Sequence, residues 1–311
     1  MSGEPTMDEG LRTPRSLKPG DRVAVVAPSG PVEPDTLERG VAVLTGMGLE
    51  VSLGAHVMRR EGYLAGFDAE RAADLAGAWC DPSVAAVVCA RGGYGASRLL
   101  GLLDWDAMAA AEPKILLGSS DITALHQAFA LRLGVASCFG PMPGNDVLGG
   151  AGGPEPRSLA SLRAALTAGP EPVTGDRVLV PGRARAPLTG GNLSLLAALC
   201  GTPYAPRFAG RIAFLEDVGE QPYRIDRMLT QLLQAGAFDG VAGVALGSWV
   251  DCGDPMPVLA DRLVPLGVPV LAGLPVGHGS PQQSVWLGGL GVIDTESCSL
   301  TGLLGDREKT M

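Results

Sequence analysis

The sequence lacks clustered basic residues, long apolar runs and a high proportion of charge. Its formal net charge is −9, and its 24 lysines and arginines are spread along 311 residues. Nucleic acids and anionic membranes bind clusters of Lys and Arg, so neither is an expected partner. No apolar run approaches the roughly eighteen residues of a membrane span. Charged residues make up 18% and hydrophobic residues 46%, which argues against disorder and predicts a large core, sufficient for two domains.

Cysteine motifs and a targeting signal are missing too. The six cysteines are widely scattered, and none forms Cys-x-x-Cys or lies at zinc-ligand spacing from a histidine. We therefore expect buried, reduced thiols, no metal and no other cofactor. Met1 to Leu17 is polar and has no apolar signal-peptide core, so we expect a flexible tail on a cytoplasmic protein.

Strand and helix patterns alternate through the first half of the chain. Continuous apolar runs predict strands, and apolar residues at helical spacing predict helices between them. The predicted strands are Val23–Val26, Glu50–Leu53, Val84–Cys89, Lys114–Leu117 and Val135–Phe139, and the first two helices are Pro34–Met47 and Asp68–Trp79. Such alternation predicts a parallel sheet with helices on both faces.

The alternation fails between Pro141 and Pro187 and then resumes. We therefore predict a tail over 1–17, an N-terminal α/β domain over 18–145, a linker over 146–186 and a smaller C-terminal α/β domain over 187–311. Val173–Val180 reads as an isolated strand. The later elements are predicted at Leu193–Leu199, Ile212–Leu215, Tyr223–Ala235, Val241–Leu246, Val258–Val264, Val268–Ala272, Val285–Leu287 and Gly291–Ile293. This fold places an active site in the cleft between the two domains.

A Gly118-Ser119-Ser120-Asp121 turn lies between a predicted strand and a predicted helix. A serine at such a sharp turn has an exposed hydroxyl beside helix N–H groups, which is the geometry of a nucleophile elbow. Ile122 stands where a glycine would complete the five-residue elbow pattern. Most serines at this kind of position only cap a helix, so both interpretations stay open.

An activated serine needs a base, and the chain has only three histidines. His126 lies six residues after Ser120 on the same helix and is a poor partner. His56 has no visible orienting group. His278 lies in a loop after the strand Val268–Ala272, at the carboxyl strand ends where α/β sheets bind ligands. A solvated loop histidine is the alternative.

The base in turn needs a carboxylate to orient it. Glu216 follows the predicted strand that ends at Leu215, and Asp217 is its rival. Arg91-Gly92-Gly93-Tyr94-Gly95 follows another strand, and its successive glycines let backbone N–H groups approach an anion. The loop lacks the spacing of a dinucleotide-binding motif.

In their order along the chain, these and other motifs resemble the LD-carboxypeptidase family. The motifs are Ala27–Ser29, Tyr63–Gly66, Arg91–Gly95, Gly118–Asp121, Leu188–Asn192, Phe214–Glu220 with Pro222–Arg227, and Pro275–His278. The resemblance runs from about Lys18 to about Thr301. The family includes the cytoplasmic murein tetrapeptide carboxypeptidases and the microcin C self-immunity peptidases.

The resemblance implies a serine peptidase with a Ser-His-Glu triad. Residue by residue, Ser120 is the nucleophile, His278 the general base and Glu216 its partner. The implied oxyanion hole consists of the backbone N–H groups of Gly93 and Asp121. The substrate is then a small peptide, a muropeptide stem from which a terminal D-amino acid is released, and the family implies a homodimer.

Further candidates for substrate binding are Gly92, Tyr94, Ser119 and Glu220. Ser119 departs from the family, in which the residue before the nucleophile is commonly aromatic, and the departure is expected to alter the pocket wall. Two other functions remain open: a self-immunity peptidase that cleaves a peptide–nucleotide antibiotic, and a non-catalytic two-domain binder of small molecules. The binder would not need Ser120, Glu216 and His278 together.

Overall fold

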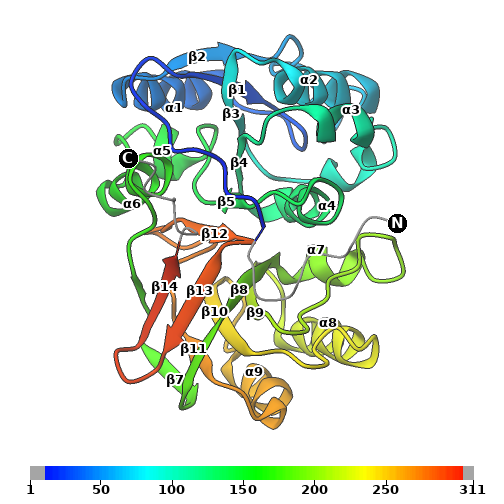
Figure 1. The fold of residues 1–311 in the computed structure, drawn as a ribbon, viewed down its shortest axis with the longest axis vertical. Coiled ribbons are helices and arrows are strands. Elements are labelled where there is room, and N and C mark those ends of the chain that lie inside the picture. The colour runs from blue at the N-terminus through cyan, green and yellow to red at the C-terminus, as the bar shows by residue number, and fades with distance from the viewer. Residues whose placement is uncertain (1–10, 304–311) are drawn as a thin grey trace, which may run out of the picture.

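The computed structural model describes residues 11–303, and its strands form two sheets, one above the other (Figure 1). One sheet has six strands in the order β12-β5-β4-β3-β1-β2, and the other has eight in the order β6-β14-β13-β8-β9-β10-β11-β7. The predicted α/β class is confirmed. No helix in this part of the chain is long and apolar enough to cross a membrane.

The six-stranded sheet holds the first half of the chain. Its parallel strands are β1 (Arg22–Val26), β2 (Glu50–Leu53), β3 (Val84–Cys89), β4 (Ile115–Gly118) and β5 (Ser137–Phe139). The C-terminal strand β12 (Val285–Leu287) returns to this sheet and pairs antiparallel with β5. Most of these strands are continuous apolar runs, as expected where helices cover both faces of a sheet.

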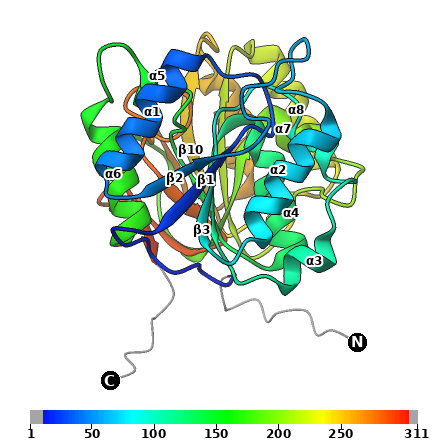
Figure 2. The same ribbon diagram turned by 90° about the horizontal axis from the view of Figure 1, so that it is seen from above.

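Helices cover the two faces as separate groups (Figure 2). One face carries α1 (Pro34–Gly46), α5 (Asp146–Gly149) and α6 (Pro156–Thr167), and the other carries α2 (Asp68–Cys80), α3 (Trp105–Ala110) and α4 (Thr123–Leu133). The short 3₁₀ turns are η1 (Ala96–Leu99), η2 (Ser120–Ile122) and η3 (Val264–Leu266). Turns η1 and η2 follow the carboxyl side of β3 and β4, so their loops share one edge of the sheet.

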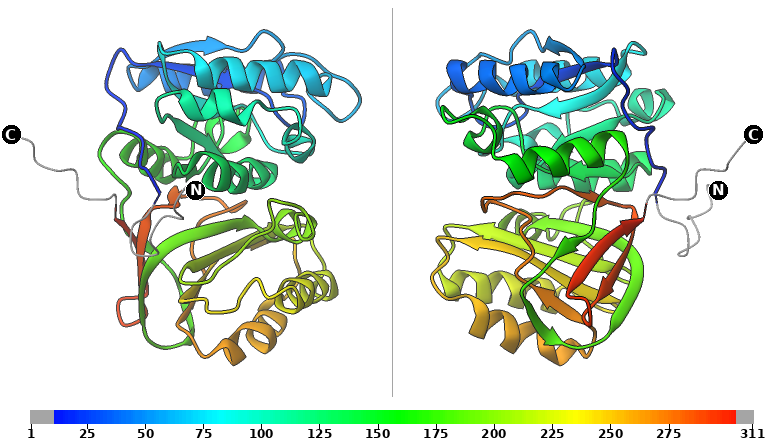
Figure 3. Two further views of the ribbon diagram at one scale, coloured as in Figure 1. Left: turned by 45° about the vertical axis from the view of Figure 1, so that its right-hand side comes forward. Right: turned by 90° about the vertical axis from the view of Figure 1, so that its left-hand side faces the viewer.

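The eight-stranded sheet is mixed. Its parallel centre consists of β8 (Arg183–Asn192), β9 (Ile212–Val218), β10 (Gly243–Val250) and β11 (Val270–Ala272). The antiparallel flanks are β6 (Val173–Thr174), β7 (Arg177–Val180), β13 (Leu290–Asp294) and β14 (Ser299–Leu303). Helices α7 (Leu193–Ala198), α8 (Pro222–Gln234) and α9 (Met256–Leu263) pack on one face (Figure 3). The other face packs toward the first sheet, where Phe214 meets Phe139 edge-on at 5.2 Å between ring centroids.

The segment predicted to be a linker, 146–186, carries elements of both sheets. Helices α5 and α6 lie in it, and α6 accepts a hydrogen bond at the Ala165 carbonyl from Trp286 Nε1, 3.1 Å away. Val173–Val180 is two paired strands instead of one isolated strand, because β6 joins β14 and β7 joins β11. Residues 1–10 of the predicted tail lie outside the described residues, whereas Leu17 is buried and its N–H donates to the Leu166 carbonyl at 2.8 Å. The division into domains stays a prediction.

Candidate active site

The turn at Ser120 has the backbone of a nucleophile elbow. Ser120 has a φ of +61°, in the left-handed region that L-residues seldom occupy. Such a conformation costs about 1–3 kcal/mol and persists only where the surroundings impose it. Ser120 is partly exposed, and its hydroxyl makes no hydrogen bond to any residue within 11–303. The side chain is therefore available to a substrate.

His126 hydrogen-bonds to the start of this turn. The ring is buried, and because a carbonyl can only accept, Nε2–H donates to the Gly118 carbonyl at 3.0 Å. Nδ1 then accepts from Ser137 Oγ at 2.7 Å. Burial lowers the pKa of His126 to about 4, against the opposing effect of the Gly118 carbonyl. His126 is therefore neutral near pH 7, and its two ring nitrogens are both bonded to residues other than Ser120.

His56 does have an orienting group, which the sequence did not reveal. Its Nδ1 lies 2.8 Å from Asp74 Oδ1 on α2. It makes no hydrogen bond to Ser120 or Glu216 in the described part of the chain. The histidine that lies against the predicted acid, Glu216, is therefore not His56 but His278.

The glycine-rich loop after β3 lies against the serine turn. A Cβ built on Gly92 would lie 2.9 Å from Ser120 Cβ, so only glycine fits there. The Gly92 carbonyl in turn accepts from Gly30 N at 3.1 Å. A Cβ on Gly92 would also lie 3.5 Å from Asp121 N, so this loop approaches the segment that carries the second predicted oxyanion-hole N–H, although the oxyanion hole itself stays a prediction.

The side chain of Asp121 joins three of these loops. It is buried, and its Oδ2 accepts from Ser29 Oγ at 2.5 Å and from Ala96 N at 2.8 Å. Burial raises the pKa of the Asp121 carboxyl, although the hydrogen bonds from Ser29 and Ala96 oppose the rise. The residue after the serine therefore anchors the turn through its side chain and leaves its N–H for other partners.

Arg71, to which the sequence analysis gave no role, connects two of these loops to the loop before α2. Its buried guanidinium donates to the carbonyls of Pro28, Gly95 and Gly66. Three loops at one sheet edge thus share a single cation. A signal for it existed, since Arg71, Leu75 and Trp79 occupy the same buried stripe of α2 at a spacing of four.

His278 and Glu216, the residues predicted to be base and acid, are hydrogen-bonded to each other. Nδ1–H of His278 donates to Glu216 Oε2 at 2.7 Å, with the glutamate side chain fully buried and the histidine 24% exposed. Burial lowers the pKa of His278, but the hydrogen bond and the charge of Glu216 outweigh it and raise the pKa above its ordinary 6.5. A buried carboxylate holding Nδ1 leaves Nε2 as the free, basic nitrogen.

The loop that carries His278 approaches Glu216 closely at a glycine. A Cβ on Gly277 would lie 2.5 Å from Glu216 Oε2 and 2.6 Å from Ser248 Oγ. Ser248, on β10, accepts from Gly279 N at 3.0 Å and donates its own N–H to the Val276 carbonyl at 2.8 Å. Ser248 therefore hydrogen-bonds the backbone before and after His278 to strand β10, a role that the sequence did not suggest.

Asp217, the rival acid, faces other partners. Its Oδ1 accepts from Asn192 Nδ2 and its Oδ2 from Ser194 N, each at 2.9 Å. Burial raises the pKa of Asp217 to about 6, and the charge of Glu216 adds to the rise while the Val218 N–H opposes it. Glu216, and not Asp217, is hydrogen-bonded to His278.

Two hydrogen bonds from the second half of the chain bracket Ser120. Asn192 N donates to Thr123 Oγ1 at 2.9 Å, and Gln282 Nε2 donates to Ser119 Oγ at 3.1 Å. The Asn192 side chain also donates to Glu216 Oε1 at 3.2 Å, so it links the acid to the serine helix. No hydrogen bond joins Ser120 to His278 within residues 11–303, and such bonds often tighten only when substrate binds.

The candidate substrate-binding residues are dispersed. Ser119 is buried and bonded to Gln282, so it anchors the two halves. Glu220 Oε2 lies 3.6 Å from Nη1 of Arg224 on α8. Tyr94 is exposed and packs beside Tyr63, with 5.8 Å between the ring centroids. Substrate contact by these residues and by Gly92 stays a prediction.

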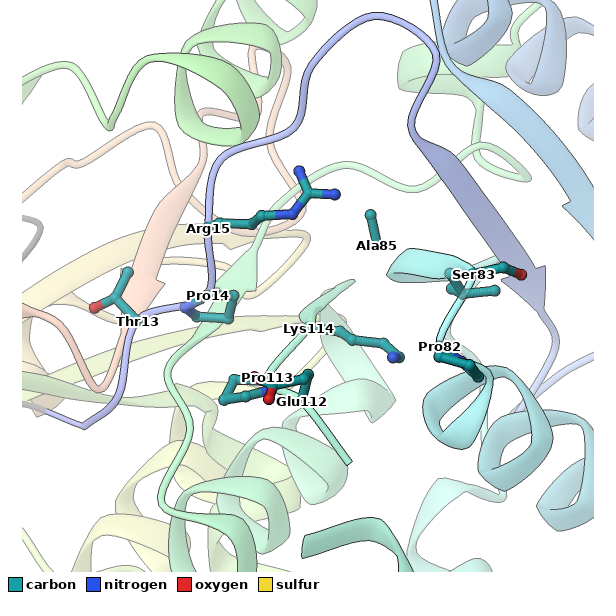
Figure 4. Close-up of a pocket in the computed structure, with 10 residues that line it drawn as sticks. Thr13, Pro14, Arg15, Pro82, Ser83, Ala85, Glu112, Pro113 and Lys114 are labelled. Atoms are coloured by element: carbon teal, nitrogen blue, oxygen red, sulfur yellow. The ribbon is translucent and has the colours of Figure 1, made fainter. Parts of the chain in front are cut away.

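Two cavities lie at opposite edges of the first sheet. One of about 640 Å³ is lined by Gly93 and Tyr94, at the serine edge. The other, of about 440 Å³, lies among Arg15, Ser83 and Lys114 at the amino ends of β3 and β4 (Figure 4). It includes none of the predicted site residues. Among the described residues there is no group of three His, Cys, Asp or Glu that could hold a metal, and the six cysteines are free thiols.

Comparison with known proteins identifies both halves. Models of the LD-carboxypeptidase N-terminal and C-terminal domains match residues 23–140 and 185–293. A Streptomyces coelicolor protein named "Putative carboxypeptidase" is 52% identical over 94% of this chain and 96% of its own length. The murein tetrapeptide carboxypeptidase of Pseudomonas aeruginosa is 37% identical over 92% of this chain and 95% of its own.

Two solved structures are similar over nearly the whole described fold. An MccF-like protein from Bacillus anthracis superposes with a TM-score of 0.85 at 27% identity, over 94% of this chain and 99% of its own. A muramoyltetrapeptide carboxypeptidase from Oxalobacter formigenes gives 0.81 at 30% identity, over 92% and 100%. The resemblance drawn from the motifs is confirmed.

Proposed function

Because the chain belongs to the LD-carboxypeptidase family, we propose that it is a serine carboxypeptidase that hydrolyses an L,D-peptide bond. The bond joins the terminal D-alanine to the rest of a muropeptide tetrapeptide. The proposed enzyme acts in the cytoplasm in peptidoglycan recycling, as a homodimer and without a cofactor. The names of the Pseudomonas and Oxalobacter relatives support this substrate class.

The observation that carries the proposal is the hydrogen-bonded His278–Glu216 pair, which Asn192 connects to the helix that follows the left-handed Ser120. Ser120 Oγ attacks the scissile carbonyl carbon while His278 Nε2 takes the hydroxyl proton. Glu216 Oε2, 2.7 Å from Nδ1, fixes the tautomer and stabilises the imidazolium that forms. His278 then protonates the leaving amine of D-alanine, and the C–N bond breaks to leave an acyl-enzyme.

The second half of the reaction repeats these roles with water. His278 takes a proton from a water molecule, the hydroxide attacks the acyl ester, and the proton returns to Ser120. During both steps the N–H groups of Gly93 and Asp121 would donate to the oxyanion. The packing of Gly92 on the serine turn supports this assignment, because it brings the two segments together.

A self-immunity peptidase that cleaves a peptide–nucleotide antibiotic is the alternative. The likeness to the MccF-like protein supports it, since the two folds agree over 94% of this chain. The same triad would perform that hydrolysis. A non-catalytic binder is less well supported, because a buried glutamate orienting a histidine is not needed for binding alone.

Mass spectrometry of peptide products would test the proposal. The purified protein is incubated with an L,D-terminated tetrapeptide, its D,D-terminated counterpart and a peptide–nucleotide conjugate. We expect release of D-alanine from the first alone, and no release by the Ser120→Ala variant. Cleavage of the conjugate alone would favour the self-immunity reading, and cleavage of none would favour the binder.

A further inference from the structure

The cavity beside Gly93 has a distinctive lining. It measures about 640 Å³, and its side chains come from Arg60, Tyr63, Arg91 and Tyr94, with glycines and a proline between them. No acidic residue lines it, although the whole chain has a formal net charge of −9. A cavity with two guanidinium groups in an acidic protein favours an anionic occupant.

The two arginines retain donors for such an occupant. Arg60 Nη2 lies 2.7 Å from Glu33 Oε1, but the two side chains are 55% and 67% exposed, so solvent weakens the pair. Arg91 Nη1 donates to the Pro31 carbonyl at 3.1 Å. Arg91 Nη2 makes no hydrogen bond within residues 11–303 and is the donor left for a ligand, whereas the unpartnered Nε is buried and out of a ligand's reach. A planar guanidinium with free N–H groups suits a carboxylate.

The cavity adjoins the reacting atoms. Gly93, whose N–H is proposed for the oxyanion hole, is also one of its lining residues. Its neighbour Gly92 packs directly on Ser120. Because an extended peptide advances about 3.3–3.6 Å per residue, a group about one residue from the scissile carbonyl is the part of the substrate that we expect to reach a cavity lined by Gly93.

We propose that this cavity is an anion subsite in which Arg60 and Arg91 bind a carboxylate of the peptide substrate. The proposal rests on the proposed function. Tyr63 and Tyr94 form an aromatic wall on which the adjacent part of the peptide packs. Two carboxylates have this chemistry: the terminal one of the released residue, and a side-chain one on the residue before the scissile bond.

Matched substrates separate these two sources. kcat/KM is measured for the tetrapeptide as free acid and as C-terminal amide, and for third residues that carry a side-chain carboxylate or only an amine. The two ratios of interest are the preference for free acid over amide and the preference for a third residue with a carboxylate over one with only an amine. We expect Arg60→Gln and Arg91→Gln each to reduce one of these two preferences by about tenfold to a hundredfold. Loss of the acid-over-amide preference assigns the terminal carboxylate, and loss of the third-residue preference assigns the side-chain one.

The control is Arg59→Gln, an exposed arginine next to Arg60 that does not line the cavity. It should keep both preferences of the wild type. If Arg60→Gln and Arg91→Gln also keep both, the subsite is refuted.

A binding experiment keeps the subsite and the proposed function distinguishable. Calorimetry compares the free-acid and amide tetrapeptides, and both third-residue peptides, on Ser120→Ala with and without Arg60→Gln. Failed hydrolysis by the wild type would contradict the function, whereas a carboxylate preference in Ser120→Ala that Arg60→Gln removes would still support the subsite. Equal affinities in both proteins, or no binding of any peptide, would overturn it.

Discussion

The two sides of the candidate site are built in different ways. On the serine side, strand β4, turn η2 and helix α4 follow one another directly along the chain. On the base side, His278 and Glu216 are 62 residues apart and meet through a loop packed on a strand. The serine side is therefore a local structure, and the base side exists only after the second sheet has assembled.

The two sides also contain different unfavourable contributions to the folding free energy. The serine side holds backbone strain, with Ser120 at a φ of +61°. The base side holds buried charge, since Glu216 and Asp217 are adjacent and both are almost fully buried. Close packing maintains the strain, and hydrogen-bond donors stabilise the buried charge. Substitutions that relieve strain should therefore change the unfolding free energy, and substitutions near the buried charge should change the pH dependence of activity.

The largest expected effect is loss of the nucleophile. Ser120→Ala should lower kcat by about 10⁴–10⁶, because no other group can form the acyl-enzyme. Ser119→Ala loses only the hydrogen bond from Gln282 and should cost less than about tenfold. Release of D-alanine is measured for both variants, with circular dichroism as the folding control. An inactive Ser119→Ala beside an active Ser120→Ala would place the nucleophile one residue earlier.

Removal of the acid should give the next largest effect. Glu216→Gln should reduce kcat by about 10³–10⁴, since an amide cannot stabilise the imidazolium. The base must be neutral, so kcat/KM falls as pH drops through the pKa of His278. In the wild type that acid limb should lie above 6.5, because Glu216 raises the pKa against burial. In Glu216→Gln burial remains as the main influence, and the limb should move below 6.5.

Asp217→Asn is the control for this experiment. The charge of Asp217 is the smallest of the influences that raise the pKa of His278, so the acid limb should shift down only slightly. Complete loss of activity in Asp217→Asn, with Glu216→Gln active, would mean that the neighbour is the true partner of the base.

Asn192 tests the connection between the two sides. Its side chain caps α7 and donates to Glu216 and Asp217. Asn192→Ser keeps a capping hydroxyl but loses the amide N–H donors to Glu216 and Asp217. We expect kcat to fall about tenfold. The acid limb should move to higher pH, because Glu216 then loses a hydrogen-bond donor and its charge acts more strongly on the pKa of His278. Asn192→Ala should show the same kinetics and a further loss of about 1 kcal/mol in unfolding free energy. Normal pH profiles in both variants would reduce Asn192 to a helix cap.

The smallest expected effect concerns strain at the serine. Glycine adopts a φ of +61° without the side-chain penalty, so Ser120→Gly should exceed Ser120→Ala in unfolding free energy by about 0.5–1 kcal/mol. Gly277→Ala, on the base side, should destabilise, because Glu216 and Ser248 leave no room for a Cβ. Urea unfolding measures all three. Equal stability of the two Ser120 variants would show that the turn is not strained.

The sequence predicted the first sheet more closely than the second. Strands β1, β2 and β3 and helices α1 and α2 were located to within a residue or so, because continuous apolar runs and helical stripes are strong local signals. Strand β8 was missed, since Arg183–Asn192 is rich in Ala, Gly and Pro, which have low strand propensity. It forms because β9 and β13 pair with it on both sides.

By itself, the sequence determined the family and the strand–turn–helix that carries Ser120, since the family depends on short motifs and their order along the chain, and the turn on neighbouring residues. Only the tertiary structure decided how Glu216 is separated from Asp217, and that Arg71, Asn192, Ser248 and Gln282 hold the site together. Each of these four side chains has a hydrogen-bond partner on another loop or strand. A hydrogen bond between distant segments leaves no periodic trace in a sequence, because it depends on where packing of the whole chain brings the two atoms.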